Sequence, residues 1–563
     1  MQQEKEFLIC KACNKKSLEV FIDFGKMPVS NAYHTKEEIA SGKEYIWNMA
    51  VGFCHDCYMV QLTEFVPYDK YIIKNSKGKT EYAFHSSLSN AMIQHFKEFA
   101  EEMQNRFLSK GDKVAEIGGN DGIMLQSYSK DFKTLNIEPS SNVAEEAKTR
   151  GIETIVDFFT QKLAEEVVTK YGKFKVITSS NVILNIHDIN EVASGVKIML
   201  SEKGVFVMQD PYMGQILEDV AYDQIYDEHV WYPSLNSLEN LFNRYGMEVF
   251  DAKLHPVHGG SMRVFIARKG DYEKTKDCKD YFNKEKERKM NTIEAYSKFA
   301  KKTKESNNNL KDLLKELKSK GKKIVGYAAA SKGTVILNYA GIGPDVIDYV
   351  VDSTPDKQGK YIPGVHIPIV SPEKFKHPYP DYALLGARNH AKEISNKETD
   401  FLKMGGRFIM PLPNPRVLES GIVKVKKLNS FFDEEGELFE TLRCDDEIFS
   451  GVFGQNLISI VKPGIIKGLH FHRKQTEYTT CIKGNILYVA IKEVNGQDLI
   501  IEKFEVGERN RILIKTEPGI WHGYTPLDGR EAVVLYTMDK AYNHKDPDTE
   551  DKDPFAFGDI WEK

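Results

Sequence analysis

The stretch VAEIGGNDG at residues 114–122 determines the fold class of the longest part of the chain. Its first residues form a short apolar run typical of a buried strand, and glycines follow at 118, 119 and 122. Glycines in a strand-to-helix turn let the backbone approach a ligand closely, and the helix that follows offers free amides. The stretch therefore predicts the first strand, turn and helix of an α/β sheet.

Strands alternate with helices on the C-terminal side of this stretch. The further apolar strands are TLNIE (134–138), VITSS (176–180) and VFVMQ (205–209). This alternation predicts a parallel sheet. We assign residues 86–270 to this Rossmann-like domain.

A second α/β block starts with KKIVGYAAASKG at 322–333. The charged segment 270–320 before it has apolar residues at helical spacing, which predicts two amphipathic helices with an Asn-rich break at 307–309. We assign 271–420 to this helical linker and a second Rossmann-like domain. Residues 421–563 have short strands separated by Gly, Pro and Asn, which predicts an all-β domain. The expected fold is multidomain α/β plus all-β.

Residues 1–85 contain two C-x-x-C pairs, Cys10/Cys13 and Cys54/Cys57. Each pair places two thiolates on one tight turn, so together they supply the four ligands of a closed tetrahedral zinc site. The alternative is a pair of disulfides. We favour structural zinc in an N-terminal zinc-binding module, because the chain has no secretion signal.

The chain of 563 residues has 77 Lys and Arg against 82 Asp and Glu, a formal charge of −5. That balance gives no electrostatic basis for binding nucleic acid or an anionic membrane. No apolar run approaches the roughly 20 residues of a membrane span. We therefore expect a cytoplasmic protein without nucleic-acid or membrane partners.

The turn at 116–122 predicts a cofactor site. Glu138 closes the next strand 20 residues beyond Gly118, where a carboxylate would bind ribose hydroxyls. The turn lacks the three-glycine spacing typical of dinucleotide sites. It therefore favours S-adenosylmethionine and a methyltransferase over a dehydrogenase.

Two polar clusters follow downstream, YDEH at 226–229 and HGGSMR at 258–263. The first puts a carboxylate beside an imidazole, which suits a general base with a pKa near neutrality. A solvated acidic helix start explains the same residues equally well.

The two C-x-x-C pairs, EIGGNDG, IEPSSNVAEEA, FF (158–159), YDEH and HGGSMR occur in an order that resembles the sugar C-methyltransferases, over residues 8–415. These enzymes methylate a carbon of a nucleotide-linked keto-deoxysugar. The resemblance implies that a base removes the C3 hydrogen beside the C4 ketone. The enolate then attacks the methyl group of S-adenosylmethionine.

The resemblance also implies roles for individual residues. His229 is the expected base, and Tyr226 and Glu228 position it or stabilise the enolate. The expected cofactor-binding residues are Glu116, Gly118, Asn120, Asp121, Glu138, Phe159 and Asn181. The expected substrate-binding residues in this part are Tyr71, His258, Gly259, Arg263, Ser331 and Lys332. The last two lie in a turn that would take the nucleotide diphosphate, although plain packing explains its glycines as well.

One position departs from the family pattern N-V-x-x-H. Here Asn181-Val182 is followed by Asn185 in place of the histidine, and His187 comes two places later. Either Asn185 takes over the polar role or His187 is an ordinary surface residue. We leave His187 out of the catalytic set.

The all-β domain contains Gly464-x5-His470-x-His472-x4-Glu477-x6-Gly484 and PGIWH at 518–522. This spacing resembles the cupin signature and implies a jelly-roll β-barrel. In metal-binding cupins the histidines at 470, 472 and 522 and Glu477 would hold iron, manganese or nickel.

The segment KGLHFHRKQTEY also resembles nucleotide-sugar 3,5-epimerases, which are cupins that work without metal. That resemblance makes His470 the base and Tyr536 the acid on the opposite face. Lys467, His472 and Tyr542 then contact the substrate. Long epimerases hold the histidine with an aspartate from a later segment, which we expect this chain to lack. We favour the metal-free epimerase over a metal cupin and over a non-catalytic dimerisation or sugar-binding module.

The resulting hypothesis is a bifunctional enzyme, because both reactions remove a proton next to the C4 ketone. It joins a C-methyltransferase to an epimerase acting at C3 or C5 of a nucleotide-diphosphate keto-deoxysugar. A homodimer through the cupin domain is a further expectation. The rival hypotheses are a sugar-nucleotide sensor without turnover and an O- or N-methyltransferase with a cupin appendage.

Overall fold

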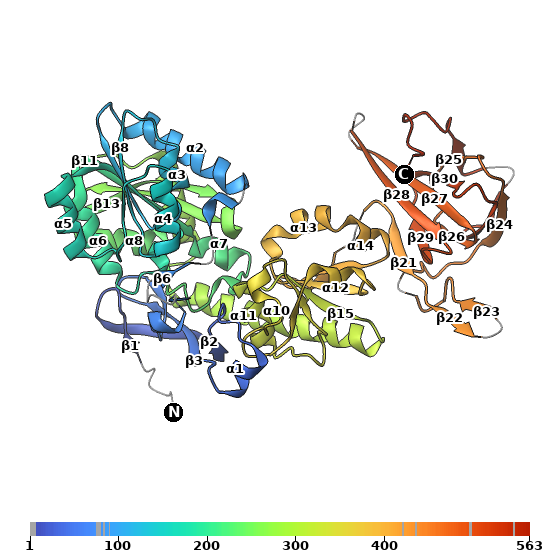
Figure 1. The fold of residues 1–563 in the computed structure, drawn as a ribbon, viewed down its shortest axis with the longest axis horizontal. Coiled ribbons are helices and arrows are strands. Elements are labelled where there is room, and N and C mark those ends of the chain that lie inside the picture. Colours follow the sequence, from blue (N-terminus) through green and yellow to red (C-terminus); the bar gives the residue numbers. More distant parts are fainter. Residues whose placement is uncertain are drawn as a thin grey trace. The chain divides into compact units, whose positions relative to one another are not determined.

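The structure is a computed structural model that describes residues 7–562 except 72, 75–79, 83–84, 89, 419–420, 434–435, 447, 495–497 and 544–546. The chain forms two compact units (Figure 1). The first comprises Met1–Leu313, Ala328–Ile369 and Pro411–Pro415. The second comprises Leu314–Tyr327, Val370–Met410 and Arg416–Lys563.

The first sheet of the first unit is antiparallel and contains the cysteine segment. Its strand order is β1 (Leu8–Ile9), β2 (Lys16–Pro28), β3 (Ile46–Cys54), β4 (Val60–Leu62) and β12 (Trp231–Tyr232). The last strand comes from far along the chain, and Trp231 pairs in register with Gln61. The cysteine segment and the residues directly after YDEH therefore share one sheet.

The second sheet has seven strands in the order β13-β14-β11-β10-β7-β8-β9. The parallel strands are β7 (Lys113–Ile117), β8 (Lys133–Ile137), β9 (Thr154–Ile155), β10 (Phe174–Ser180) and β11 (Leu200–Pro211). Strands β13 (Met247–His255) and β14 (Ser261–Arg268) are antiparallel to their neighbours. All four predicted strands are confirmed, and buried side chains such as Val114, Val176 and Val207 form the core.

Helices cover this sheet (Figure 1). They are α2 (Asn90–Phe107), α3 (Ile123–Gln126), α4 (Ser141–Thr149), α5 (Gln161–Tyr171), α6 (Ile189–Met199), α7 (Met213–Glu218) and α8 (Leu235–Asn243). Among the described residues no helix is long and apolar enough to cross a membrane.

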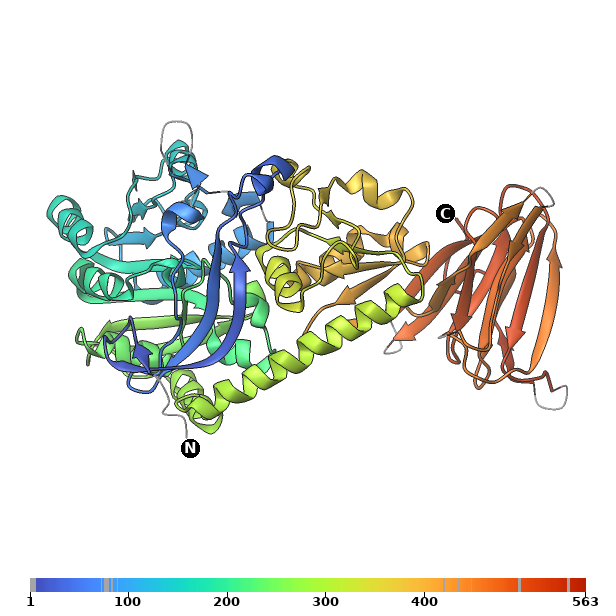
Figure 2. The same ribbon diagram turned by 90° about the horizontal axis from the view of Figure 1, so that it is seen from below.

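The charged segment after this domain forms α9 (Lys276–Glu287) and one long helix, α10 (Ile293–Ser319), which Figure 2 shows without interruption. The predicted break at 307–309 is therefore wrong. Asn307 is buried and donates from Nδ2 to the Tyr339 carbonyl at 3.2 Å. This tertiary contact outweighs the weak helix preference of asparagine.

The second α/β block contributes to both units. The first unit holds α11 (Ser331–Ala340) and β16 (Val350–Val351). In the second unit β15 (Ile324–Tyr327), β18 (Tyr382–Leu385) and β19 (Arg407–Met410) run parallel, and β20 (Arg416–Val417) pairs antiparallel with β19. The domain boundaries at 86, 271 and 421 stay predictions.

The C-terminal part has two five-stranded antiparallel sheets, as predicted for an all-β domain. The first contains β21 (Lys424–Lys427), β29 (Ile512–Thr516), β26 (Glu477–Lys483), β31 (Ala532–Met538) and β24 (Gln455–Val461). The second contains β28 (Asp498–Gly507), β27 (Asn485–Val494), β30 (Trp521–Pro526), β25 (Lys467–His472) and β32 (Thr549–Asp551). One core cluster unites both sheets, with Ile486 and Tyr488 from one and Ile514 and Val534 from the other.

Candidate functional sites

The four N-terminal cysteines converge on one point. The Sγ atoms of Cys10 and Cys57 lie 3.7 Å apart, and those of Cys13 and Cys54 lie 3.6 Å apart. All four thiols are free, so no disulfide joins them. Zn–S bonds of about 2.3 Å in a tetrahedron place sulfurs roughly 3.8 Å apart, which matches this arrangement. The four ligand atoms fit zinc.

The zinc ligands are tied to the strand that follows YDEH. Gln61 on β4 accepts a hydrogen bond from the Lys11 amide at 3.0 Å through Oε1. The same residue pairs with Trp231 of β12, whose indole donates to the Ile186 carbonyl at 2.8 Å. The cluster therefore supports the segment that carries His229.

The glycine turn after β7 is packed tightly. A Cβ on Gly118, which has φ +69°, would lie 2.4 Å from Val182. A Cβ on Gly119 would lie 2.4 Å from Oδ1 of Asn136. The Asn120 amide donates to Oε2 of Glu138 at 3.0 Å. Glycine is required here by close packing, and the turn is fixed by the acid at the end of β8.

Buried carboxylates surround this turn. Glu116 is 3% exposed, and its Oε2 has no hydrogen-bond partner among the described residues. Burial, followed by the negative charges of Glu138 and Asp121, raises the pKa of Glu116 to about 8. Asp121 accepts from the Ser87 amide at 3.0 Å. The turn is therefore an acidic environment.

Of the two phenylalanines at 158–159, the exposed one faces the aromatic residues of the site. Phe159 is buried against α6, where a Cβ on Gly195 would lie 2.8 Å from its ring. Phe158 is 42% exposed, and its ring centroid lies 5.6 Å from that of Tyr68. Asn181, with φ +56°, donates its amide to the Gln209 carbonyl. The geometry favours Phe158 over the predicted Phe159 as a ligand contact.

His229 is held in a defined tautomer. Its Nδ1 lies 3.1 Å from the Gln224 carbonyl, which only accepts hydrogen bonds, so Nδ1 carries the proton. Nε2 is then unprotonated and accepts from the Tyr226 hydroxyl at 2.7 Å. The Tyr232 hydroxyl donates to the His229 carbonyl at 2.5 Å. The imidazole of His229 therefore has its basic nitrogen, Nε2, hydrogen-bonded to the Tyr226 hydroxyl.

The acids beside His229 are not a solvated helix start. Asp227 is buried and accepts from the Ser30 amide at 2.8 Å. Glu228 accepts from Nδ2 of Asn31 at 2.8 Å. Burial, and then the neighbouring Asp227, raises the pKa of Glu228 to about 7. The loop at 30–31 of the cysteine module thus binds both acids.

His187 lies against the predicted substrate residue Tyr71. Its Nε2 is 3.4 Å from the Tyr71 hydroxyl, and its ring stacks on Tyr68 with centroids 3.9 Å apart. Burial lowers the pKa of His187 to about 4, which keeps the ring neutral. Asn185 has a buried Oδ1 without a partner among the described residues. His187 is therefore not an ordinary surface residue, because it packs against Tyr68 and the predicted substrate residue Tyr71.

Arg263 points into the protein interior. It is 2% exposed, pairs with Glu102 at 2.6 Å and donates to Gln209 at 2.9 Å. Its guanidinium lies 3.6 Å from the centroid of the Phe99 ring. These contacts favour a structural role over the predicted substrate contact. Gly259, with φ +89°, ends the 3-10 turn Val257–Gly259, and the side chain of His258 lies outside the described residues.

Ser331 and Lys332 begin α11, and the turn before them has polar partners that the sequence did not indicate. The Ala329 carbonyl accepts from the Tyr33 hydroxyl and from Nζ of Lys357, both at 2.7 Å. The Ala329 amide donates to Asp352 at 2.8 Å. The sequence feature that could have indicated these partners is Asp352, directly after β16, followed five residues later by Lys357.

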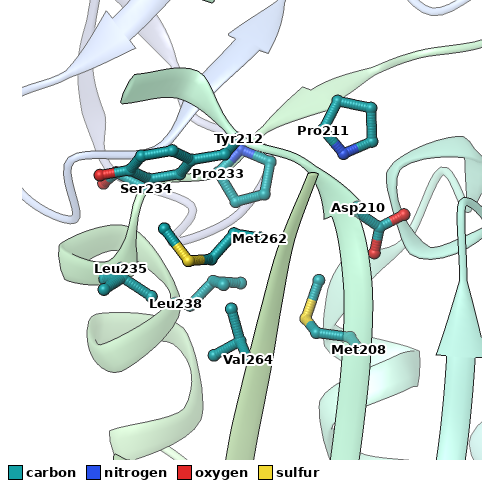
Figure 3. Close-up of a pocket in the computed structure, with 10 residues that line it drawn as sticks. All are labelled: Met208, Asp210, Pro211, Tyr212, Pro233, Ser234, Leu235, Leu238, Met262 and Val264. Carbon is teal, nitrogen blue, oxygen red and sulfur yellow. The ribbon is translucent and has the colours of Figure 1, made fainter. Parts of the chain in front are cut away.

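Asp210 is a further buried acid that the sequence interpretation missed. It lies near the C-terminal end of β11, where open α/β sheets bind ligands. It is 2% exposed, and neither carboxylate oxygen has a partner among the described residues. Burial raises its pKa to about 7. It lines a small, largely apolar pocket with Met208, Leu238 and Met262 (Figure 3).

In the C-terminal part, His470 has an aspartate partner. Its Nδ1 lies 2.8 Å from Oδ1 of Asp551. Strand β32 carries the aspartate and pairs with β25, with His470 opposite Asp551. The expectation that this chain lacks an aspartate partner is therefore wrong, because a strand of the C-terminal tail supplies one.

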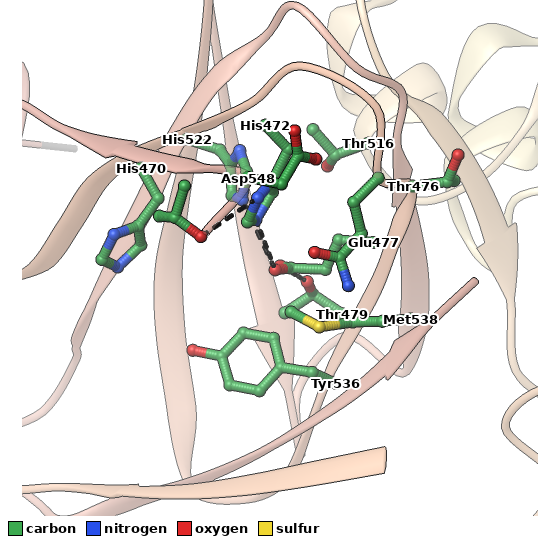
Figure 4. Close-up of polar contacts among 12 residues, drawn as sticks. His470, His472, Thr476, Glu477, Thr479, Thr516, His522, Tyr536, Met538 and Asp548 are labelled. Carbon is green, nitrogen blue, oxygen red and sulfur yellow. Dashed lines mark hydrogen bonds and ion pairs between the residues drawn. The ribbon is translucent and has the colours of Figure 1, made fainter. Parts of the chain in front are cut away.

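His472, Glu477 and His522 form a separate buried triad (Figure 4). Oε2 of Glu477 lies 3.7 Å from Nε2 of His472 and 3.5 Å from Nε2 of His522. The His522 Nδ1 lies 3.0 Å from the Ile520 carbonyl. Although burial alone would lower the pKa of His522, Glu477 raises it. His472, predicted to contact substrate, thus belongs to this triad.

The other predicted residues of this part have contacts of their own. The Tyr536 hydroxyl donates to the Tyr524 hydroxyl. Lys467 is exposed and pairs in register with Tyr524. Tyr542 is 46% exposed, and its amide donates to Gln455 at 3.2 Å. Burial, and then the charge of Glu477, raises the pKa of Tyr536 well above its usual range.

Family models match most of the chain. They are a putative zinc binding domain at 10–71, a methyltransferase domain at 85–252, a C-methyltransferase C-terminal domain at 256–413 and a polysaccharide biosynthesis C-terminal domain at 431–550. C-methyltransferase NovU from Streptomyces niveus is 33% identical over 414 residues, which are 73% of this chain and 97% of NovU. The chain belongs to the C-methyltransferase family.

The C-terminal part of this family member has other relatives. Spore coat polysaccharide biosynthesis protein SpsL from Bacillus subtilis (strain 168) is 32% identical over 128 residues, which are 22% of this chain and 84% of SpsL. A solved dTDP sugar isomerase from Desulfovibrio desulfuricans G20 is 22% identical, with a TM-score of 0.23, over 24% of this chain and 85% of that chain.

Proposed function

We propose that the chain methylates C3 of a nucleotide-linked 4-keto-6-deoxysugar through its enolate, and that its C-terminal part epimerises such a sugar at C3 or C5. The observation that carries the proposal is the pair of histidines, His229 and His470, each with Nδ1 bound to an oxygen acceptor. Membership of the C-methyltransferase family supports the first activity.

In the first reaction His229 acts as the base. The C4 ketone acidifies the C3 hydrogen, and Nε2 of His229 takes this proton while the C–H electron pair forms the enolate. The Tyr226 hydroxyl, which donates to Nε2 before the reaction, then donates to the enolate oxygen. The neutral tautomer of His229 prepares it for this role.

The acidic turn fits S-adenosylmethionine. The bound cofactor would supply an electrophilic methyl group, and its sulfonium and ammonium groups are cations. Glu116, Asp121 and Glu138 place three carboxylates at the turn, and Oε2 of Glu116 and Oδ1 of Asp121 have no hydrogen-bond partner among the described residues. Such a cluster repels the diphosphate of a dinucleotide. We expect Glu116, Glu138 and the Asn120 backbone to hold the methyl donor.

In the second reaction His470 removes a proton beside the ketone, and the electron pair again forms an enolate. Asp551 orients the imidazole and stabilises the imidazolium that forms. Tyr536 returns a proton from the opposite face, which inverts the carbon. The buried Tyr536 phenol is held protonated for this step because its pKa is raised.

A metal-binding cupin is the second candidate, because the triad of His472, Glu477 and His522 offers three donors within 4.8 Å of one another. The Nε2 atoms of His472 and His522 both face Oε2 of Glu477, at 3.7 and 3.5 Å. Elemental analysis decides between the candidates. One zinc per chain fits the metal-free epimerase, whereas a second, different metal that disappears in His522→Ala supports the metal cupin.

The methyl transfer is tested by incubating a nucleotide 4-keto-6-deoxysugar with S-adenosylmethionine carrying an isotopically labelled methyl group. The proposal predicts the label on C3 by nuclear magnetic resonance. A label on oxygen or nitrogen, or no transfer to any keto-sugar, would contradict it.

A further inference from the structure

Two tyrosines from different sheets meet inside the C-terminal part. Tyr524 lies on β30 and Tyr536 lies on β31. Within their own sheets they pair in register with Tyr488 and with Thr479. The Tyr536 hydroxyl donates to the Tyr524 hydroxyl, and the ring centroids lie 6.0 Å apart with the ring planes inclined by 50°. The contact between the two phenols therefore joins one sheet to the other.

Tyr524 is fixed by its surroundings. Its side chain is 1% exposed and belongs to the core cluster that contains Tyr488 and Val534. Tyr536 packs against the same cluster. Burial raises the pKa of Tyr524, so its hydroxyl keeps its proton at neutral pH. Tyr524 thus places a neutral hydroxyl, which can both donate and accept a hydrogen bond, against the oxygen of the proposed acid.

The environment of Tyr536 opposes the loss of its proton. Burial, and then the negative charge of Glu477, favours the neutral phenol and so raises its pKa. A phenolate at this position needs a hydrogen-bond donor, because an unpaired charge inside a protein is costly. The hydroxyl of Tyr524 is already in contact with the oxygen that would carry the charge.

We propose that Tyr524 is a positioning residue for the epimerisation, whose hydroxyl directs the Tyr536 hydroxyl at rest and stabilises the Tyr536 oxygen after the proton has left. This role depends on the proposed epimerase activity. The hydrogen bond reverses between the two states, and rotation about the C–O bond of each phenol is enough to reverse it. After the reversal Tyr524 donates to a charged oxygen, which strengthens the hydrogen bond.

In the second proton transfer the enolate carbon forms a C–H bond with the proton of Tyr536, and the electron pair of the broken O–H bond stays on the Tyr536 oxygen. The proton of Tyr524 stays on Tyr524. Solvent restores the proton of Tyr536 and takes the proton that His470 removed. Because His470 has Asp551 as its own partner at Nδ1, we expect the first proton transfer to be independent of Tyr524.

The test incubates the full-length protein with a nucleotide 4-keto-6-deoxysugar in D2O without S-adenosylmethionine. Mass spectrometry measures the deuterium uptake, which reports the first proton transfer, and nuclear magnetic resonance measures the amount of inverted sugar. In Tyr524→Phe the ratio of inverted sugar to deuterium uptake should fall roughly 10- to 100-fold, because hydrogen bonds to charged groups stabilise them by about this factor. Tyr536→Phe should lower the same ratio at least as far.

The matched control is Tyr478→Phe. Tyr478 is fully buried, and its hydroxyl accepts from the Ser450 amide at 2.7 Å. It directly precedes Thr479, which pairs in register with Tyr536, so its side chain lies on the opposite face of the sheet. This variant loses a buried hydroxyl of the same sheet and should keep the wild-type ratio.

A second variant does not depend on removing the hydroxyl. 3-Fluorotyrosine in place of Tyr524 keeps the donor and should keep the wild-type ratio, whereas a fall to the level of Tyr524→Phe would contradict the role of the hydroxyl. A folded Tyr524→Phe protein with the wild-type ratio, or one that loses deuterium uptake together with inversion, would also overturn this role. A wild type that shows neither uptake nor inversion with any keto-sugar would instead overturn the proposed epimerase itself.

Discussion

At the scale of single residues, the proposed proton transfer depends on the hydrogen bond between Tyr226 and His229. The Gln224 carbonyl fixes the proton on Nδ1, so Nε2 is the basic nitrogen of His229. When Nε2 accepts a proton, it no longer accepts the hydrogen bond from the Tyr226 hydroxyl. The phenol is thus placed to stabilise the charge that the reaction produces.

Replacing Tyr226 by Phe should lower kcat for methyl transfer by roughly 100-fold, because a positioned acid contributes about 10²–10⁴ to rate. KM and the melting temperature should change little. Steady-state kinetics with Tyr272→Phe as control checks this, since the Tyr272 hydroxyl only donates to the Lys203 carbonyl. Equal kcat values for Tyr226→Phe and the control would refute the role of Tyr226.

Asp210 provides a stability prediction. Burial raises its pKa from 3.8 to about 7, so the folded state keeps a proton that the unfolded state has lost. The resulting destabilisation grows as pH rises from about 4 to 7 and is complete above 7. Asp210→Asn removes it, so the melting temperature of the variant should gain on that of the wild type over this range. Calorimetry at several pH values measures the difference, and a difference independent of pH would contradict the prediction.

Asp551→Asn should slow deuterium exchange into the keto-sugar at the C-terminal site by roughly 100-fold or more, because asparagine no longer stabilises the imidazolium of His470. Asp553→Asn is the control, since the Asp553 carboxylate accepts from the Phe555 amide of the same tail and, among the described residues, contacts no histidine. Mass spectrometry in D2O measures the exchange. Exchange by Asp551→Asn at the wild-type rate would remove Asp551 from the mechanism.

Sequence motifs identified the reactive residues but not how their side chains point. The four cysteines come together as their spacing predicts, and Tyr226 contacts His229, which fits the roles that the family resemblance implies. Asp551 was missed because it lies 81 residues from His470 and meets it only through strand pairing. Arg263, which the family resemblance assigned to substrate, pairs with Glu102 inside the protein. The spacing of a motif predicts contacts between residues that are close in sequence. The contacts of His470 with Asp551 and of Arg263 with Glu102 join residues far apart in sequence, which the folded sheets bring together.

At the scale of elements, β12 connects the zinc site to the base. It follows His229 directly and pairs with β4, whose Gln61 contacts the cysteine turn. The 30–31 loop after β2 reaches Asp227 and Glu228. The cysteine module is thus a support for the catalytic segment, which its position in the sequence did not reveal.

Cys54→Ser should therefore release the zinc and abolish methyl transfer, because a structural zinc site contributes directly to folding. Elemental analysis should show the loss of one zinc per chain. Deuterium exchange at the C-terminal site should persist, since that site lies in the other compact unit. The matched control is Cys278→Ser, at a cysteine outside the cluster. Methyl transfer at the wild-type rate by a zinc-free protein would contradict the supporting role.

The extents of the elements were predictable where the pattern was strong. Four of the parallel strands of the seven-stranded sheet, β7, β8, β10 and β11, lie where short apolar runs placed them, because parallel strands are buried on both faces. The Asn-rich stretch in α10 misled because local preference is weak compared with burial against Tyr339.

At the scale of the whole molecule, the two histidine sites lie in different compact units, with His229 in the first and His470 in the second. Each has its own group at Nδ1, the Gln224 carbonyl for His229 and Asp551 for His470. The proposal of two activities requires that each site works when the base of the other is removed.

The most direct test incubates the protein with a nucleotide 4-keto-6-deoxysugar in D2O, with and without S-adenosylmethionine, and follows the sugar by mass spectrometry. We predict deuterium uptake without the methyl donor that persists in His229→Ala and disappears in His470→Ala, and methyl transfer that persists in His470→Ala and disappears in His229→Ala. Loss of both activities in either variant, although the variant folds, would contradict two independent sites. Neither exchange nor methylation with any keto-sugar would contradict the proposed function itself.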